Sequence, residues 1–467
     1  MPGGRASTYD RPVTPLTREQ RTLAIGLVMG VTLVAFEMTA VITALPTISD
    51  ELGGESLYGV ALAAYTLADV VALVAAGELA DRRGPTLPYV LSLCTFVVGL
   101  LVAASAPTMG VIVLGRALQG AGTGGLAPIA YILVTRAFPQ DRQGSIYAFL
   151  SAGWVLPSLV APTFGGLITD HASWRWVFLC IVPFAVAVAL LATRPMRAYG
   201  PLPADHASTR VPTAALAAVG VGALTYGAQE DRWSVAVVLC VAGVLVALPA
   251  LRKLLPAGTM TAAVGLSAVI ACRMLATAAF LGVDSFVPLA AHEIHGASAL
   301  LQGFLIVGGA ISWTGGQLWR SRHPGASTAS ATRTGFVLLA VGAFITWPVV
   351  FEGWPLWATF LTWCVGGLGM GLLFNPTSLA AMSYARRGHE GIVSSQTHLA
   401  DALGFSLMGG FGGALVATAD RGSWSMTSAL SVCMLSAVAV AALGAIVAGR
   451  ARRAAAGAQQ APEIALR

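Results

Sequence analysis

Ionisable side chains are rare inside the long apolar stretches of this 467-residue chain. Those that do occur there are candidates for proton uptake and release. A charged group at the centre of a bilayer costs about 2.5–3.5 kcal/mol even on insertion scales, so it marks either a function or a buried pair. The residues that fit this description are Glu37, Asp69, Arg116, Arg273, Asp284, His398 and Asp401.

Glu37 and Arg116 are predicted to interact. At about 1.5 Å per helical residue, Glu37 lies roughly 22 Å along the first apolar stretch, and Arg116 lies roughly 9 Å below the opposite end of the fourth. Across a hydrocarbon core of about 30 Å, these depths agree to within one helical turn. Burial favours the neutral acid, whereas a neighbouring arginine favours the carboxylate, so Glu37 is placed to titrate.

A second set of ionisable residues lies in the other half of the chain. Arg273 and Asp401 reach similar depths in two further stretches, and His398 is one helical turn from Asp401 on the same face. Arg273 and Asp284 are eleven residues apart and lie near one helix face, so both could line a cavity. The alternative for the Glu37–Arg116 and Arg273–Asp401 pairs is a static role in helix packing.

The composition indicates that membrane helices position these residues. Hydrophobic residues make up 56% of the chain and charged residues 10%, whereas a soluble domain is about 25% charged. The net charge of +6 is scattered between apolar runs, so we predict no nucleic-acid partner. The six cysteines show no metal-site or disulfide spacing, and we predict neither a cofactor nor a metal. The only lysine, Lys253, precedes a leucine, which excludes a phosphate-binding loop here and hence direct drive by ATP.

Fourteen stretches are long enough to span a bilayer, which takes about 20 apolar residues. The first, at about residues 22–45, is too long for a cleavable signal core, so we interpret it as a retained helix. An even number of spans puts both termini on one side of the membrane. Every second loop is rich in arginine, which places both termini in the cytoplasm. The stretches are centred near residues 34, 68, 97, 122, 157, 184, 220, 243, 276, 310, 343, 369, 405 and 437.

The two halves of the chain resemble each other. A proline, a glutamate and a glycine near the end of the first stretch recur 242 residues later, and three glycines of the fourth recur after 247 residues. We infer a duplicated six-helix unit, and because six is even, both copies insert in the same orientation. The matches are Pro46, Glu51 and Gly54 with Pro288, Glu293 and Gly296, and Gly120, Gly122 and Gly124 with Gly367, Gly369 and Gly371.

The predicted fold is an all-α integral membrane protein with 14 transmembrane helices, built as two parallel-repeat six-helix bundles plus two inserted helices. Two similar bundles that rock about a central site would provide alternating access. The predicted segments are a cytoplasmic N-terminal segment (1–21), an N-terminal bundle (22–194), a linker with the inserted helices (195–260), a C-terminal bundle (261–450) and a cytoplasmic tail (451–467).

One predicted loop carries a family motif. Residues 77–84 read Gly-Glu-Leu-Ala-Asp-Arg-Arg-Gly, which resembles the signature loop of the major facilitator superfamily. Residues 116–122 are similar to a stretch of the family's fourth helix, and residues 174–178 resemble the start of the sixth helix in its fourteen-helix drug:proton antiporters. The resemblance covers residues 20–450 and implies a proton-coupled secondary transporter.

The expected gating loop comprises Gly77, Asp81, Arg82 and Gly84. Gly84 permits a sharp turn between antiparallel helices. Asp81 could cap the N-terminal end of a helix that starts near residue 391 in the other half, which would hold the cytoplasmic side closed. The alternative is a solvated charged turn. The second half has Arg320 at the position of this aspartate, so we expect its loop to be degenerate.

A motif of family exporters occurs in the fifth stretch. It reads Ala-Pro-Thr-Phe-Gly-Gly at residues 161–166, without the usual leading glycine. Prolines and small residues permit helix bending and close helix approach, a role that also fits plain packing. We expect this role for Pro157, Pro162, Gly165 and Gly166.

The resemblance also bears on the buried charges. In this superfamily the first and fourth helices of each repeat line the central cavity, so we predict that Glu37 is the principal proton-coupling carboxylate. Asp69 follows Tyr65-Thr66-Leu67-Ala68, a run familiar in the family's second helix, and either faces the interface between bundles or takes part in coupling. All seven ionisable residues are candidates for the proton-coupling and substrate cavity.

These observations predict a secondary active transporter that exports small lipophilic or cationic compounds in exchange for protons, in a bacterial plasma membrane. Its expected partners are a small-molecule substrate, protons and the lipid bilayer, and its expected functional unit is a monomer. Export of a metabolite or a lipid is the alternative within the superfamily. A receptor or an intramembrane enzyme is the alternative from another class, although the sequence contains no G-x-S-x-G or H-E-x-x-H motif.

Overall fold

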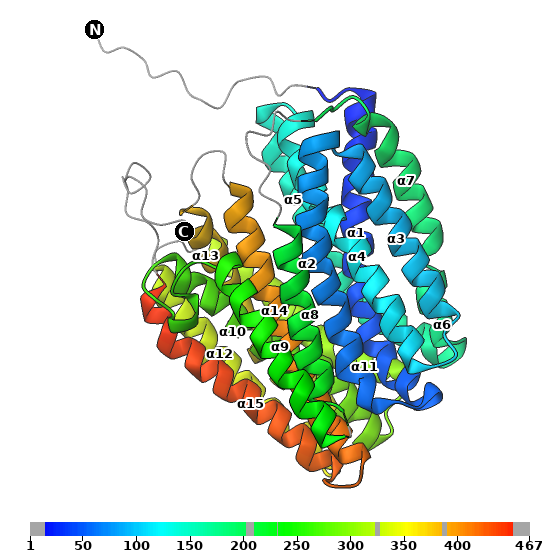
Figure 1. Ribbon diagram of the computed structural model, residues 1–467, viewed down its shortest axis with the longest axis vertical. Helices are drawn as coiled ribbons and strands as arrows, with labels where there is room; N and C mark the ends of the chain where they lie inside the picture. The colour runs from blue at the N-terminus through cyan, green and yellow to red at the C-terminus, as the bar shows by residue number, and fades with distance from the viewer. Residues whose placement is uncertain (1–14, 202–209, 231, 323–326, 385–389, 452–467) are drawn as a thin grey trace.

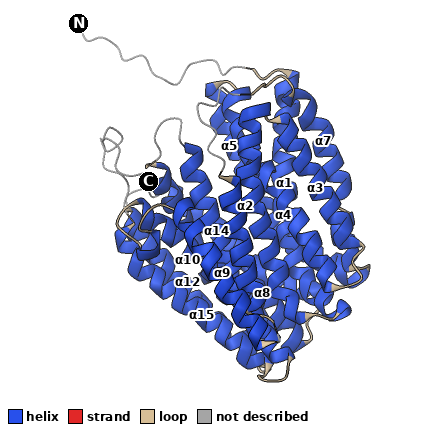
Figure 2. Cartoon of the chain, viewed as in Figure 1, coloured by secondary structure: helices blue, strands red, loops and turns tan. Residues whose placement is uncertain are grey.

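The computed structural model describes residues 15–201, 210–230, 232–322, 327–384 and 390–451. Within these ranges every regular element is a helix (Figure 2). In the view of Figure 1, helices α1 to α7 lie mainly on one side of the molecule and α10 and α12 to α15 on the other, with α8 and α9 between them. Helix α11 lies on the side of the first group, where it packs against α5. Each of the fourteen centres predicted from the sequence lies within a helix.

The first group of helices begins with α1 (Arg18–Leu52), whose start is defined by Thr17. The Thr17 hydroxyl accepts from the N–H of Gln20 at 3.2 Å, and the Thr17 N–H donates to Gln20 Oε1 at 3.0 Å. These bonds satisfy donors that a helix start otherwise leaves free. α1 packs against α5 and α7, and α4 packs against α2 and α3. The bounds are α2 Tyr58–Arg83, α3 Thr86–Ala104, α4 Met109–Ala137, α5 Gln140–His171, α6 Trp174–Leu179 and α7 Val182–Met196.

The second group repeats this arrangement. α10 packs against α14 and α15, and α13 packs against α11 and α12. Helices at equivalent places in the two groups therefore make equivalent contacts, as a duplicated six-helix unit requires. The bounds are α10 Leu266–His295, α11 Ala299–Arg322, α12 Thr328–Thr346, α13 Leu356–Met382, α14 Glu390–Asp420 and α15 Met426–Val447.

The remaining pair, α8 (Val211–Gly227) and α9 (Trp233–Leu254), lies outside this repeat. α8 packs against α9 and also against α2 and α14, which belong to different groups. α9 is more peripheral, and its Leu245 side chain is 68% exposed. The inserted pair therefore covers one side of the seam between the two groups.

Twelve helices in the described ranges are long and apolar enough to cross a membrane, and α6 and α7 together form one of them. α8 is apolar but has only 17 residues, and α5 is not among the twelve. The chain is thus a multi-pass membrane protein, all-helical in its described ranges. The predicted count of fourteen spans is not confirmed.

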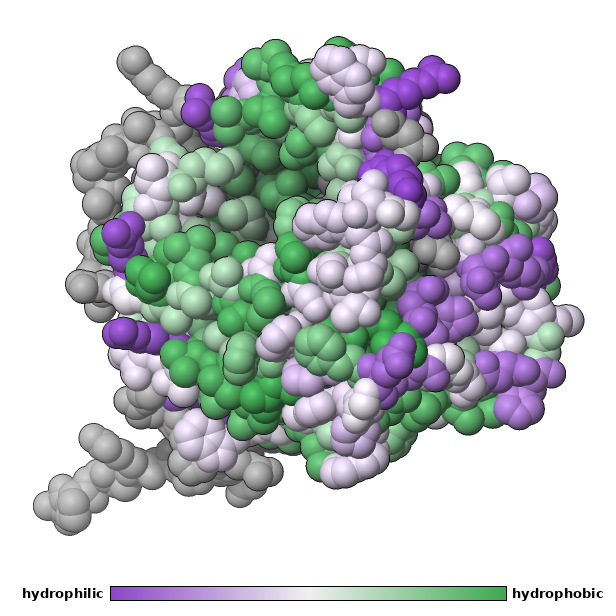
Figure 3. Space-filling model, turned by 90° about the horizontal axis from the view of Figure 1, so that it is seen from below, coloured by the Kyte–Doolittle hydropathy of each residue, from purple (hydrophilic) through white to green (hydrophobic). Residues whose placement is uncertain are grey.

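The outer surface of the helices is apolar. Leu190 on α7 is 71% exposed and Ile446 on α15 is 75% exposed. Figure 3 views the lower end of the molecule, where apolar residues are interspersed with patches of polar residues. Large apolar side chains exposed along helices that are long enough to cross a membrane suit contact with lipid.

The predicted loop at residues 77–84 is instead mostly helical. α2 continues to Arg83, and the chain turns only at Gly84, where φ is +81°. Glycine adopts this left-handed conformation without the steric cost that a side chain would add. Asp81 therefore lies in the last turn of α2. The Gly84 N–H donates to Ala80 O at 2.9 Å, so the helical hydrogen bonds continue up to the glycine where the chain changes direction. The loop prediction was wrong because a charged cluster at a helix end has the composition of a loop.

Candidate functional site

Glu37 and Arg116 form the interaction that their depths predict. Glu37 of α1 accepts a hydrogen bond from Arg116 Nη1 of α4, and the two side chains are 0% and 3% exposed. Arg116 Nη1 also donates to Gln119 Oε1 at 2.7 Å, and its guanidinium lies 4.2 Å from the centroid of the Tyr65 ring. Burying two charges is costly unless they are paired and hydrogen-bonded. Glu37 Oε2, however, is buried and has no hydrogen-bond partner among the described residues.

Asp69 lies on α2 and is partly exposed. Its Oδ1 accepts from Thr123 Oγ1 of α4 at 2.9 Å, so its partner is neutral. Glycines of α4 allow its backbone to approach that of α2. A Cβ at Gly120 would lie 1.9 Å from Tyr65 O, and one at Gly124 would lie 2.2 Å from Asp69 O. In this half, two of the three repeated glycines therefore allow backbone contact between α2 and α4, whereas the third, Gly122, faces α3, where a Cβ would lie 2.4 Å from Phe96 N.

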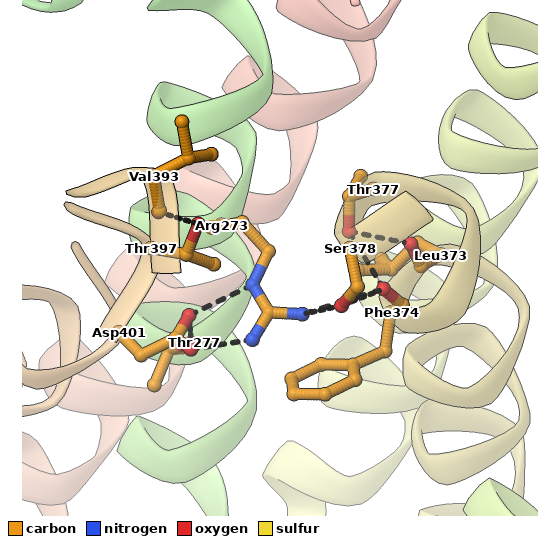
Figure 4. Close-up of polar contacts among 9 residues, drawn as sticks. All are labelled: Arg273, Thr277, Leu373, Phe374, Thr377, Ser378, Val393, Thr397 and Asp401. Carbon is orange, nitrogen blue, oxygen red and sulfur yellow. Dashed lines mark hydrogen bonds and ion pairs between the residues drawn. The ribbon is translucent and has the colours of Figure 1, made fainter. Parts of the chain in front are cut away.

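Arg273 of α10 and Asp401 of α14 form the second pair (Figure 4). Arg273 Nε donates to Asp401 Oδ1 at 3.0 Å and Nη2 donates to Oδ2, so the two groups meet through parallel bonds. Thr277 Oγ1 donates to Asp401 Oδ1 at 3.1 Å, and Arg273 Nη1 donates to Ser378 Oγ of α13 at 2.9 Å. The guanidinium lies 3.5 Å from the centroid of the Phe374 ring. Arg273 thus connects three helices.

His398 and Asp284 have different surroundings. His398 lies one turn before Asp401 on α14 and is exposed. Asp284 lies eleven residues beyond Arg273 on α10, or about 16 Å along the helix axis. Its Oδ1 accepts from Trp363 Nε1 of α13 at 2.7 Å. The structure thus brings Asp284 to an indole rather than to the arginine on its own helix.

The end of α2 contacts the inserted helix pair. Arg82 Nη2 lies 3.8 Å from Glu78 Oε2 one turn earlier. Glu78 Oε1 also accepts from the N–H of Arg210, which directly precedes α8, at 2.7 Å. The predicted contact of the Asp81 side chain with the helix near residue 391 lies outside the described part of the chain.

The small residues of α5 allow contacts in two directions. A Cβ at Gly165 would lie 2.9 Å from Ala40 O of α1, and one at Gly166 would lie 2.2 Å from Ala299 O of α11. Pro157 and Pro162 lie inside the same helix. This motif therefore lets α5 touch one helix of its own group and one of the other.

The two groups are joined at the end where α5 finishes and α11 begins. Asp170 in the last turn of α5 accepts from the backbone N–H groups of Ala299 and Leu300, each at 2.8 Å. These two N–H groups lie in the first turn of α11, where they have no acceptor within the helix. A carboxylate at the start of a helix also interacts favourably with the helix dipole. Tyr58 of α2 donates to Ser285 O of α10 at 2.9 Å. The sequence pattern did not reveal Asp170, because an acidic residue near a helix end carries no mark of its partner.

We expect Asp170→Ala to loosen this end of the molecule. Loss of a helix cap costs about 1 kcal/mol, which corresponds to roughly a fivefold shift in an opening equilibrium. A cysteine at position 299, buried beneath the contact, should then react with a membrane-impermeant maleimide about five times faster. The background is a cysteine-free chain, and Asp420→Ala at the end of α14 serves as the control. Unchanged reactivity in the Asp170 variant would show that this cap does not hold the groups together.

The buried ionisable residues thus form separate polar sites in the two groups of helices. Each group pairs a carboxylate with an arginine, and aromatic rings lie against both arginines. In the described ranges, no group of three or more His, Cys, Asp or Glu residues is placed to hold a metal ion. Such sites can exchange a proton or bind a charged group of a small molecule.

Several known proteins resemble this chain in sequence. An uncharacterised MFS-type transporter of Mycobacterium tuberculosis is 33% identical over 307 residues, which cover 62% of this chain and 44% of that protein. The chain therefore spans less than half of that relative's length. A probable multidrug-efflux transporter of the same species is 27% identical over 423 residues, covering 85% and 88% of the two chains. Multidrug resistance protein 3 of Bacillus subtilis is 24% identical over 405 residues, covering 82% and 77%.

Solved structures and a family profile extend the comparison. An auto-inhibited peptide transporter of the POT family superposes with a TM-score of 0.66 at 18% identity, covering 96% of this chain and 99% of the other. The human organic anion transporter MFSD10 gives 0.59 at 14% identity, covering 92% and 100%. At these identities the likeness concerns the fold alone. The profile of the Major Facilitator Superfamily matches residues 27–409, from α1 into α14, and the chain therefore belongs to that superfamily.

Proposed function

We propose that this chain is a proton-coupled antiporter that exports small lipophilic or cationic compounds by alternating access. Its superfamily consists of transporters, and relatives named for multidrug efflux and multidrug resistance support export. The observation that carries proton coupling is the buried Glu37 Oε2, which has no partner among the described residues. An anionic oxygen in that position is costly, and a bound proton removes the cost.

The proposed cycle uses the surroundings of Glu37. A proton that arrives from outside neutralises Glu37 and weakens its hold on Arg116, which keeps its bond to Gln119 and its contact with Tyr65. The free positive charge of Arg116 then disfavours a cationic cargo, and loss of the proton to the cytoplasm restores the pair. Asp69 of α2, which accepts from Thr123 of α4, is a second candidate carboxylate in this half. Each charge that moves down a potential of 100 mV contributes about 2.3 kcal/mol.

We propose the remaining architecture on the same basis. Residues 22–194 and 261–450 rock as two bundles, residues 195–260 form the linker, and both termini are cytoplasmic in a plasma membrane. Fourteen spans are supported by α5 and α8, which lie alongside the other helices (Figure 1). Their 32 and 17 residues measure about 48 Å and 26 Å, close to or beyond the thickness of a hydrocarbon core. Asp81 with Gly77, Arg82 and Gly84 acts as the cytoplasmic gate, and the functional unit is a monomer.

Cysteine labelling is expected to report this orientation. Arg232 and Arg252 are both exposed and lie near opposite ends of α9, about 30 Å apart. In a cysteine-free background, Arg232→Cys should react with an impermeant maleimide added to intact cells, and Arg252→Cys should react only after the cells are opened. Because both side chains are exposed, the difference reports the side of the membrane and not burial. The reverse pattern would overturn the proposed orientation.

Transport by purified protein tests the function itself. Proteoliposomes with an imposed pH gradient should accumulate a fluorescent lipophilic cation only when the gradient is present. Accumulation of metabolites or lipids but of no lipophilic compound would favour the alternative cargo. Failure to move any compound under a gradient, by protein that is folded and inserted, would reject proton-coupled export.

A further inference from the structure

Each of the two helix groups has a carboxylate at the corresponding position, but the partners of the two carboxylates differ. In the first group Glu37 of α1 is paired with Arg116 of α4. In the repeat, the residue 247 positions after Arg116 is Trp363 of α13. Trp363 Nε1 donates to Asp284 of α10, and α10 packs against α13 as α1 packs against α4. An indole thus replaces the guanidinium, and Asp284 has a neutral partner where Glu37 has a cationic one.

Aromatic rings extend from Asp284 across three helices. Trp363 stacks on Phe280 with ring centroids 4.9 Å apart. Phe280 meets Trp313 of α11 edge to face at 5.1 Å, and Trp313 meets Phe374 in the same manner at 5.2 Å. Trp363 and Phe280 are buried, whereas Asp284, Trp313 and Phe374 are partly exposed. The buried rings therefore support a wall that the other three side chains present to accessible space.

The wall also offers a hydrogen-bond donor. Trp313 Nε1 is buried and has no hydrogen-bond partner among the described residues. A buried indole N–H usually finds an acceptor, so this unpaired donor marks a place where an acceptor atom of a ligand would be stabilised. Its neighbours Phe280 and Phe374 supply ring faces and edges but no acceptor group.

We propose that Asp284 and the row Trp363, Phe280, Trp313 and Phe374 form a binding site for the charged aromatic end of a lipophilic cation. The carboxylate offsets the positive charge, and aromatic rings attract a cation through their negative faces. Arg273 lies against Phe374 at the far end of the row, 3.5 Å from that ring centroid and about 16 Å from Asp284 along α10. It does not oppose this, because Asp401 neutralises its charge. The site rests on the proposed function, since it names where the cargo binds, but binding needs no proton gradient.

Equilibrium binding of ethidium to the full chain in lipid nanodiscs tests the site. Asp284→Asn keeps an oxygen that can accept from Trp363 and keeps the side-chain shape, so the helix packing should persist. It removes the negative charge, and the Kd for ethidium should rise at least tenfold. Phenanthridine, an uncharged compound with the same ring system, should bind the wild type and Asp284→Asn equally. Glu293→Gln, an exposed acid on the same helix, is the matched control and should bind ethidium as the wild type does.

The outcomes separate this site from the proposed function. Equal ethidium affinity in the wild type and Asp284→Asn, or no ethidium binding by the wild type, would overturn the site. A loss of phenanthridine binding as large as the loss of ethidium binding would also overturn it, because the variant would then act through packing. A further outcome is that the wild type binds ethidium with the predicted dependence on Asp284 and yet exports nothing under a pH gradient. That result would reject the proposed function and support the binding site.

Discussion

Vesicles that contain Glu37→Gln are expected to accumulate no more cargo under a pH gradient than vesicles without protein. Glutamine can still accept from Arg116, which also keeps Gln119 and the Tyr65 ring, so the protein should fold and insert. An amide, however, cannot carry the proton that drives exchange. Binding of cargo at equilibrium should persist in part, because that step does not require proton release. Gradient-driven uptake of a fluorescent cation, normalised to inserted protein, is the measurement.

The matched control for this variant is Glu51→Gln on the same helix. Glu51 also pairs with an arginine, but Arg175 and Glu51 are 36% and 50% exposed. An exposed ion pair contributes at most about 1 kcal/mol, so this variant should transport as the wild type does. Export against a gradient by Glu37→Gln, combined with its loss in Asp69→Asn or Asp401→Asn, would place the coupling carboxylate elsewhere.

Arg273→Leu is expected to destabilise the protein by up to about 3–5 kcal/mol, because it leaves Asp401, whose side chain is only 20% exposed, without its counter-charge. The double variant Arg273→Leu with Asp401→Leu should recover most of this loss, since neither charge is then left without a partner. Thermal unfolding of the four proteins in detergent gives the double-mutant cycle. Arg175→Leu, which breaks the exposed pair with Glu51, should shift the unfolding temperature little.

The same cycle separates the two interpretations of the Arg273–Asp401 pair. A double variant that recovers both stability and transport would assign the pair to helix packing. Recovery of stability without transport would assign it to the transport cycle. A double variant whose destabilisation equals the sum of the two single variants would show that the two side chains are not energetically coupled, against the geometry of Figure 4.

Depth along the helices was sufficient to find both ion pairs. A charge within an apolar helix needs an opposite charge at the same depth, and the chain offers few choices. For the same reason depth could not find the partner of Asp284. Trp363 is neutral and apolar in composition, so nothing in the hydropathy pattern separates it from the tryptophans that face lipid, such as Trp357 with 66% exposure.

Residues that join the two groups were harder to predict. Asp170 meets the start of α11 across 129 positions of sequence. The glycines of the α5 motif were expected to permit close packing. The sequence did not predict that Gly165 faces α1 while Gly166 faces α11. Adjacent residues on a helix point in directions about 100° apart, so their partners depend on how the helix is rotated within the bundle.

Composition and hydropathy therefore predict membrane residence and helical structure, and residues that recur at a fixed offset predict the duplicated unit. In lipid every backbone polar group needs an internal partner, which leaves a long apolar segment little choice but a helix. The same helices are apolar around most of their circumference, so the sequence carries little information about their rotation and contacts. The partners of Asp284 and Asp170 emerged only from the packed structure, because packing selects the face that each helix turns toward its neighbours.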